Sequence, residues 1–111
     1  MTLGDFINTN TFTLVNDGGN HDAEISGLYC CDLLSIAMGN APTGCIWVTV
    51  MNNINTLAVA SLAECACIVL ACNVQAEEAF ISKAAEQNIT VFQTELPVFD
   101  AAYLAHGKIG Q

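Results

Sequence analysis

The sequence predicts a single layered α/β domain in which helices flank a mostly parallel β-sheet. Short, nearly continuous apolar runs occur at 45–51, 67–71 and 89–92, and such runs are typical of strands that are covered on both faces. Segments of helical composition or periodicity separate these runs, so that strands and helices alternate along the chain. The length of 111 residues, 53% of them apolar, corresponds to one domain with a substantial core.

The first third of the chain predicts two strands and one helix. Residues 12–15 alternate between polar and apolar, as in a short strand, and 16–20 (Asn-Asp-Gly-Gly-Asn) form a strong turn signal. A second strand is expected over 24–31. Asp32 is a favourable N-cap for the short amphipathic helix that follows, and Gly39 is expected to end that helix.

Three further helices separate or follow the apolar strands. The segment 57–64 is rich in alanine and leucine, which favours a helix. A more polar helix is expected over 77–87, with Asn88 at its end. The last helix begins near Pro97, because proline is favoured in a first helical turn, and runs to about residue 105. Residues 107–111 are expected to form a frayed tail.

The charge of the chain limits its partners. Eleven carboxylates face two lysines and no arginine, for a formal net charge of −9. Proteins that bind nucleic acids or anionic membranes use basic residues for that purpose, so neither is expected as a partner. The apolar stretch 57–72 is too short for a membrane span and contains Glu64. Residues 1–10 have no features of a secretory signal, so we expect a cytoplasmic location.

Six cysteines are present, namely Cys30, Cys31, Cys45, Cys65, Cys67 and Cys72. Their spacings of CC, CxC and Cx₄C differ from the C-x₂-C pairs of most zinc and iron–sulfur sites. Free cysteines most often pack as small core hydrophobes, and we favour this interpretation. The alternative is a metal or redox role in which Cys65, Cys67 and Cys72 supply the thiolates.

Polar residues follow each predicted strand. The carboxyl ends of parallel strands meet at one edge of a sheet, where helix N-termini also offer N–H groups to an anion. The same residue types are favoured caps and turn formers, and this structural role explains all but the asparagines at 52–55 well. The candidate ligand-binding residues at this edge are Asp32, Asn52, Asn53, Asn55, Thr56, Asn73, Thr94 and Glu95.

No catalytic motif is complete. The chain has no P-loop, and no catalytic residue, metal site or cofactor is assigned. The cluster His21-Asp22-Ala23-Glu24 contains residue types that bind metal ions, but its position in a predicted loop favours a solvated surface instead. We therefore do not expect an enzyme.

Several segments occur in an order that matches a known domain family. They are Asp32-Leu33-Leu34-Ser35 with Met38-Gly39, Gly44-Cys45-Ile46-Trp47-Val48-Thr49, Asn53-Ile54 with Ala58-Val59-Ala60 and Leu62, and Ile89-Thr90-Val91-Phe92-Gln93-Thr94 with Phe99. Over residues 25–104 they resemble the DRTGG domain and the N-terminal domain of bacterial HPr kinase/phosphorylase. Asn52-Asn53 and Ala71-Cys72-Asn73 stand where that family has its Asp-Arg pair and its Thr-Gly-Gly turn.

The resemblance implies one DRTGG-like regulatory or assembly domain over 1–111, without the kinase half. Such domains are often linked to dimer formation. Only 12% of the residues are charged, so a hydrophobic interface between two copies would bury surplus apolar surface. The predicted function is a non-catalytic regulatory or interaction module that forms a homodimer. The alternative is a sensor of a small effector, such as an adenine nucleotide, at the polar sheet edge. The sequence identifies no partner protein.

Overall fold

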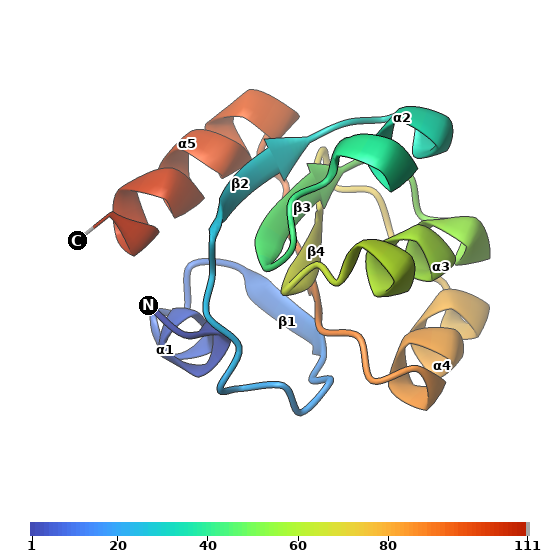
Figure 1. Ribbon diagram of the computed structural model, residues 1–111, viewed down its shortest axis with the longest axis horizontal. Helices are drawn as coiled ribbons and strands as arrows, with labels where there is room; N and C mark the ends of the chain where they lie inside the picture. Colours follow the sequence, from blue (N-terminus) through green and yellow to red (C-terminus); the bar gives the residue numbers. More distant parts are fainter. Residues whose placement is uncertain (111) are drawn as a thin grey trace.

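A five-stranded sheet lies at the centre of the computed structural model, which describes residues 1–110 (Figure 1). The strand order is β1-β5-β4-β3-β2. Strands β2 to β5 are parallel, whereas β1 pairs with β5 in the antiparallel direction. This mostly parallel sheet confirms the predicted fold class. The strands are β1 (Thr13–Asn16), β2 (Gly27–Cys30), β3 (Cys45–Thr49), β4 (Cys67–Leu70) and β5 (Val91–Gln93).

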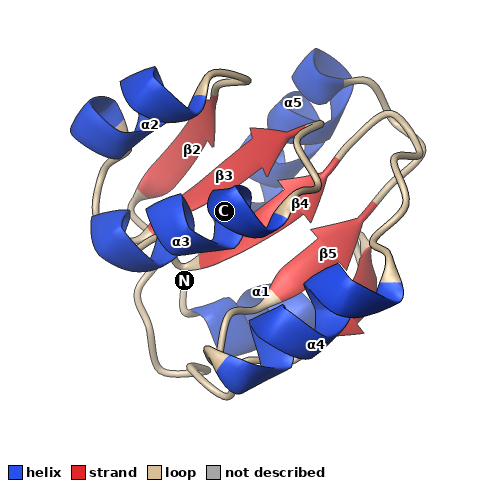
Figure 2. Ribbon diagram, turned by 90° about the vertical axis from the view of Figure 1, so that its right-hand side faces the viewer, coloured by secondary structure: helices blue, strands red, loops and turns tan. Residues whose placement is uncertain are grey.

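Helices cover both faces of the sheet (Figure 2). The parallel strands follow one another in sequential order, so crossovers of the same hand place α2, α3 and α4 on one face. The other face is covered by α1 and α5. No helix among residues 1–110 is long and apolar enough to cross a membrane. The helices are α1 (Leu3–Asn8), α2 (Leu34–Asn40), α3 (Ile54–Ala63), α4 (Glu78–Glu86) and α5 (Val98–Ile109).

The central strands β3 and β4 are buried along their whole length. Their side chains alternate between two cores, because successive residues of a strand point to opposite faces. Trp47 and Ile68 pack with the helices α2 to α4. Ile46 and Val69 pack with α1 and α5. This two-sided burial explains why both strands are almost entirely apolar in sequence.

The helix α1 is absent from the sequence-based prediction. It begins with a capping box, in which the Thr2 hydroxyl accepts from the Asp5 N–H and the Asp5 carboxylate accepts from the Thr2 N–H, both at 3.1 Å. The spacing of Thr2 and Asp5 is the signal that could have predicted this helix. Phe6 then packs against Phe12 and Phe92, which joins α1 to the sheet.

Three other helices differ from their predicted bounds. The helix α2 continues to Asn40, so Gly39 does not end it. The helix α3 begins at Ile54 rather than at 57, because the Asn53 side chain accepts a hydrogen bond of 2.9 Å from the Asn55 N–H and caps it. The helix α5 continues to Ile109, so the predicted tail over 107–111 is wrong as far as residue 109. Ile109 packs against the core between α5 and the sheet, which stabilises these last turns. Residue 111 lies outside the described residues.

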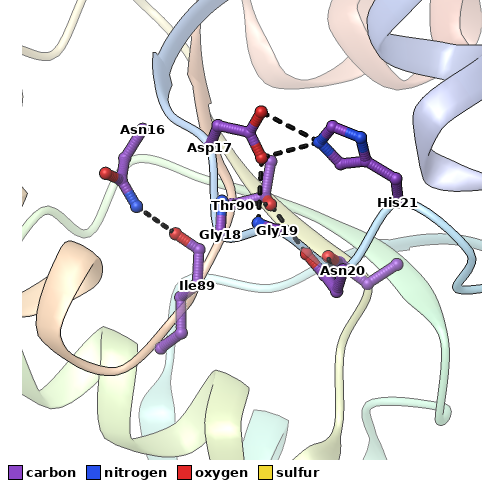
Figure 3. Close-up of polar contacts among 9 residues, drawn as sticks. Asn16, Asp17, Gly18, Gly19, Asn20, His21, Ile89 and Thr90 are labelled. Carbon is purple, nitrogen blue, oxygen red and sulfur yellow. Dashed lines mark hydrogen bonds and ion pairs between the residues drawn. The ribbon is translucent and has the colours of Figure 1, made fainter.

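The turn after β1 is fixed to the start of β5 by hydrogen bonds around the buried Thr90 (Figure 3). The Thr90 hydroxyl accepts from the Gly18 N–H at 2.9 Å and donates to the Asn20 side chain at 2.8 Å. The Asn16 side chain donates to the Ile89 carbonyl at 2.8 Å. These bonds hold the antiparallel edge strand in place next to β5.

The Gly18 backbone lies close to the backbone of Asn88 and Ile89, and replacing Gly18 with alanine tests this contact. An added Cβ would lie 2.5 Å from the Asn88 carbonyl oxygen, so Gly18→Ala should lower the free energy of unfolding by about 1–3 kcal/mol. The control is Gly39→Ala, because Gly39 lies inside α2, beyond its predicted end, and no atom lies within 4 Å of an added Cβ there. That change should be neutral or stabilise by up to about 1 kcal/mol. Urea denaturation measures both, and wild-type stability of Gly18→Ala would contradict the contact.

Candidate functional site

The loops after the parallel strands meet at one edge of the sheet, as predicted. After β4 the chain turns to α4 on one face, and after β5 it turns to α5 on the opposite face (Figure 2). Ligands of open α/β sheets bind where neighbouring connections diverge in this way. In this protein two backbone bonds join the diverging loops, from the Cys72 N–H to the Leu96 carbonyl at 2.8 Å and from the Asn73 N–H to the Thr94 carbonyl at 2.9 Å.

A polar hollow lies at this point of divergence. Its volume is about 150 Å³, and it is lined by Thr13, Asn73, Gln93, Thr94 and Glu95. Three of the predicted site residues therefore lie together here. The antiparallel strand β1 contributes Thr13, which sequence reasoning did not connect with this edge. The hollow is smaller than most small-molecule pockets, which enclose at least about 300 Å³.

Two glutamines that the prediction missed organise the edge. The Gln93 side chain accepts from the Ala76 N–H at 3.2 Å and donates to the Gln75 side chain at 3.4 Å. The Gln75 side chain in turn donates to the Asn73 carbonyl at 3.0 Å. Gln93 is the polar last residue of an otherwise apolar strand, and that position could have identified it. Gln75 lies in a loop and has no comparable signal.

A second hollow lies beside the N-terminus of α3. It measures about 290 Å³ and is lined by Asn52, Asn53, Ile54, Asn55, Glu77, Ala79 and Phe80. The Asn52 side chain donates to the Gln75 carbonyl at 2.8 Å, and Asn53 caps α3. These two predicted site residues are thus committed to the protein's own backbone. Asn52 and Asn53 therefore have structural roles that their sequence pattern did not indicate.

Asp32 does not cap α2, and this prediction is wrong. The N-cap of α2 is Leu33, and no side chain bonds to that helix end. The Asp32 carboxylate instead accepts from the Thr49 hydroxyl at 2.7 Å and from the Val50 N–H at 3.0 Å. These two donors at the end of β3 hold the carboxylate away from the N-terminus of α2. Asp32, which follows β2, therefore joins the end of β2 to the end of β3.

Thr56 and Thr94 are less exposed than the other predicted residues near the hollow between β4 and β5. Thr56 is fully buried and lines neither hollow, and its hydroxyl has no hydrogen-bond partner among residues 1–110. The Thr94 hydroxyl accepts from the Leu96 N–H at 3.2 Å, which shapes the turn into α5. Among the predicted residues, Asn73 and Glu95 are the exposed ones that line the hollow between β4 and β5.

The backbone at Cys72 and Asn73 is unusual. Both residues are in the left-handed region, with φ of 58° and 57°. This region favours glycine, because a side chain there is crowded by the backbone. By the resemblance, Ala71-Cys72-Asn73 stands where the family has its Thr-Gly-Gly turn, and two of these three residues have a backbone conformation that favours glycine. Backbone of this kind is often found next to functional sites.

The thiols that were predicted as an alternative site are separated. Cys65 precedes β4, whereas Cys72 follows it, so the strand lies between them. Cys67 faces the core below α1 and α5, while Cys65 packs against the core on the opposite face. Within residues 1–110, no group of three metal-ligating side chains comes together.

His21 forms a local hydrogen-bonded pair with Asp17 rather than part of a larger polar site. Its Nε2 atom lies 2.8 and 2.9 Å from the two carboxylate oxygens of Asp17 (Figure 3). A hydrogen bond from the Gly19 N–H, and then the bond with His21, lower the pKa of Asp17. Both side chains are about half exposed, so the pair is a surface feature of the turn after β1.

The fold is similar to the solved structure of the CBS and DRTGG domains from the regulatory region of Clostridium perfringens pyrophosphatase, in complex with its activator, diadenosine tetraphosphate. The TM-score is 0.74 at 15% sequence identity. This chain has a DRTGG-like fold. The match covers 94% of this chain and 45% of that one, so the chain spans less than half of its structural neighbour. No protein-family model and no curated protein matches the sequence.

Two buried threonines give a matched test of the hydrogen bonds at this edge. Thr49→Val removes the partner of Asp32 and should lower the free energy of unfolding by about 1–3 kcal/mol. Thr56→Val removes a buried hydroxyl that has no partner, so stability should be unchanged or rise by about 1 kcal/mol. Chemical denaturation of the two variants measures the difference. Equal losses would show that the Asp32–Thr49 bond does not stabilise the edge.

Proposed function

We propose that this chain is a non-catalytic regulatory module that forms a homodimer through α5. The observation that carries the proposal is an exposed aromatic surface on this helix. Phe99 is 73% and Tyr103 is 71% exposed, and their rings stack with centroids 5.9 Å apart. An aromatic pair in water is the kind of group that protein interfaces bury. The regulatory region to which the neighbouring structure belongs supports the assignment to a regulatory role.

The same helix also has a hollow that could accept an aromatic side chain of a second copy. A hollow of about 460 Å³ lies at its C-terminal half, lined by Tyr103, Leu104, His106, Gly107 and Lys108. No atom lies within 4 Å of an added Cβ at Gly107, so the helix is open to close approach there. Phe99 lies two turns before Gly107. In an antiparallel pair of α5 helices, each Phe99 therefore meets the hollow beside Gly107 of the other copy.

Charge supports the antiparallel arrangement. Two copies that each carry −9 repel one another over most of their surface. This repulsion is weaker at α5, because the helix has one carboxylate, Asp100, in its first turn and the basic residues His106 and Lys108 in its last turn. Antiparallel pairing brings Asp100 of one copy towards Lys108 of the other. A two-fold axis through the middle of α5 satisfies both contacts at once.

Self-association is tested with two equally exposed apolar residues on opposite faces. Phe99→Ser should weaken the dimer at least tenfold, because it removes the aromatic group that fills the partner's hollow. The control Leu62→Ser changes a side chain on α3 that is also 73% exposed and should leave association unchanged. Sedimentation velocity across micromolar concentrations measures both. A monomeric wild-type chain, or a dimer that Leu62→Ser disrupts and Phe99→Ser does not, would contradict the proposal.

A second candidate function is effector sensing at the hollow between β4 and β5. Its support is the position of the hollow where the connections diverge, together with the nucleotide activator in the neighbouring structure. No arginine is present to pair with phosphate, and the chain has two lysines. A nucleotide there would depend on amide side chains, backbone N–H groups and a bridging Mg²⁺ to offset the negative charge.

Thermal denaturation with diadenosine tetraphosphate and Mg²⁺ tests this second function. Binding to the folded state should raise the melting temperature by several degrees at a ligand concentration about 100 times the Kd. Asn73→Gly removes a side chain that lines the hollow at a backbone angle that glycine accepts, and it should abolish the shift. The control Asn88→Gly has the same left-handed backbone, precedes β5 at the other edge, and should keep the shift. No stabilisation of the wild type at millimolar ligand would exclude this function.

A further inference from the structure

Two cysteine thiols lie in contact at the edge of the sheet opposite the polar hollows. The Cys45 thiol donates a hydrogen bond to Cys65 Sγ, with 3.6 Å between the two sulfur atoms. Cys45 is the first residue of β3, and Cys65 lies in the short connection between α3 and β4. Cysteine spacing did not predict this pair, because 20 residues separate the two positions in sequence.

Backbone hydrogen bonds hold the two segments together on either side of the thiols. The Gly44 N–H donates to the Glu64 carbonyl, and the Ala66 N–H donates to the Cys45 carbonyl, both at 2.8 Å. These bonds hold the two main chains near each other, so the sulfur atoms need to move only a short distance to form a covalent bond. A disulfide has an S–S length of about 2.05 Å, so the sulfur atoms need to approach by about 1.5 Å.

The two thiols differ in accessibility and in acidity. Cys65 is partly exposed, whereas Cys45 is fully buried. The hydrogen bond from Cys45 lowers the pKa of Cys65, while the same bond and burial raise the pKa of Cys45. The thiolate is the reactive form of cysteine, so Cys65 is the group that a small oxidant meets first. Cys45 remains protonated and in contact with Cys65, so its thiol proton is available to the oxygen that leaves in a second step.

We propose that Cys45 and Cys65 form an oxidation site at which a hydroperoxide closes a reversible intramolecular disulfide. The Cys65 thiolate attacks the peroxide, its S–O bond forms as the O–O bond breaks, and a hydroxide or alkoxide leaves. Cys45 then attacks the sulfenic sulfur of Cys65 and gives up its thiol proton to the sulfenic oxygen, so that the S–S bond forms as the S–O bond breaks and water leaves. The two thiols lose two electrons in total, and the peroxide is reduced by two.

The other cysteines are placed less favourably for this reaction. Cys67 is fully buried, and burial raises its pKa. Cys30 is exposed, but partial burial of its thiol, and then the charge of Asp32, raise its pKa. Cys72 is exposed and follows β4 at the opposite end of that strand from Cys65. Cys31 donates its thiol hydrogen to the Leu33 carbonyl at 3.4 Å.

The disulfide has a direct structural consequence. It links the start of β3 to the start of β4 and closes a chain segment that contains α3. Closing a loop of this length restricts the unfolded chain and stabilises the folded state. The oxidised protein should therefore melt several degrees higher than the reduced protein. The site packs on the face opposite to α5, so the inference does not depend on the proposed homodimer.

The test is oxidation of the reduced full chain with hydrogen peroxide, followed by peptide mapping without reduction. The expected result is a mass loss of about 2 Da and one cross-linked peptide pair that joins Cys45 to Cys65, both reversed by dithiothreitol. The chain has no arginine and Lys83 is its first lysine, so trypsin would leave all six cysteines in one fragment. Cleavage after Glu64 separates Cys45 from Cys65, chymotryptic cleavage removes Cys30, Cys31 and Cys72 from the two peptides, and fragmentation of the linked pair in the mass spectrometer distinguishes Cys65 from Cys67.

Three variants assign the roles of the two thiols. Cys45→Ala should leave a sulfenic acid on Cys65 that dimedone traps, and Cys65→Ser should form no intramolecular disulfide. The control Cys72→Ser should retain the disulfide and the rise in melting temperature. A disulfide between other cysteines, a covalent dimer, or overoxidation of Cys65 without a cross-link would overturn the proposal. The wild-type peptide map decides the question by itself if a variant fails to fold.

Discussion

Burial of β3 and β4 on both faces is the constraint on which the rest of this structure depends. The sequential order of the parallel strands places α2, α3 and α4 on one face only. Two apolar strands with one bare face would be unstable in water, so other segments have to cover that face. The helices α1 and α5 do so, because residues of both pack against this face of the sheet.

The position of α5 leaves one side of this helix exposed. Ala101 and Ala105 pack against the sheet and let the helix lie close to it. The opposite side of the same helix carries Phe99 and Tyr103, which contribute little to this packing and remain exposed. A helix of this kind is apolar on two sides, and the second side is suited to another protein surface. The homodimer that we propose uses that side.

The polar edge of the sheet is held together mainly by its own side chains. Asp32 joins β2 to β3, and a chain of bonds through Asn52, Gln75 and Gln93 connects the loops that follow β3, β4 and β5. Neutral amides can bond to one another as well as to a ligand, and the amides of Gln75 and Gln93 bond to one another here. A ligand in the hollow between β4 and β5 would have to compete with these internal bonds.

The sequence by itself determined the alternation of strands and helices and the mostly parallel sheet, because apolar runs and helical periodicity are local signals. The DRTGG-like fold was implied by the resemblance of several segments to that family, and the similar solved structure confirms it. The sequence also placed the polar residues at the correct edge, since strand direction fixes where each loop emerges. Tertiary structure decided the rest. The partner of Asp32, the closeness of Cys45 to Cys65, and the exposure of Phe99 all depend on segments that are distant in sequence. Such contacts arise only when the strands pair and α5 packs across the sheet, and no local pattern encodes them.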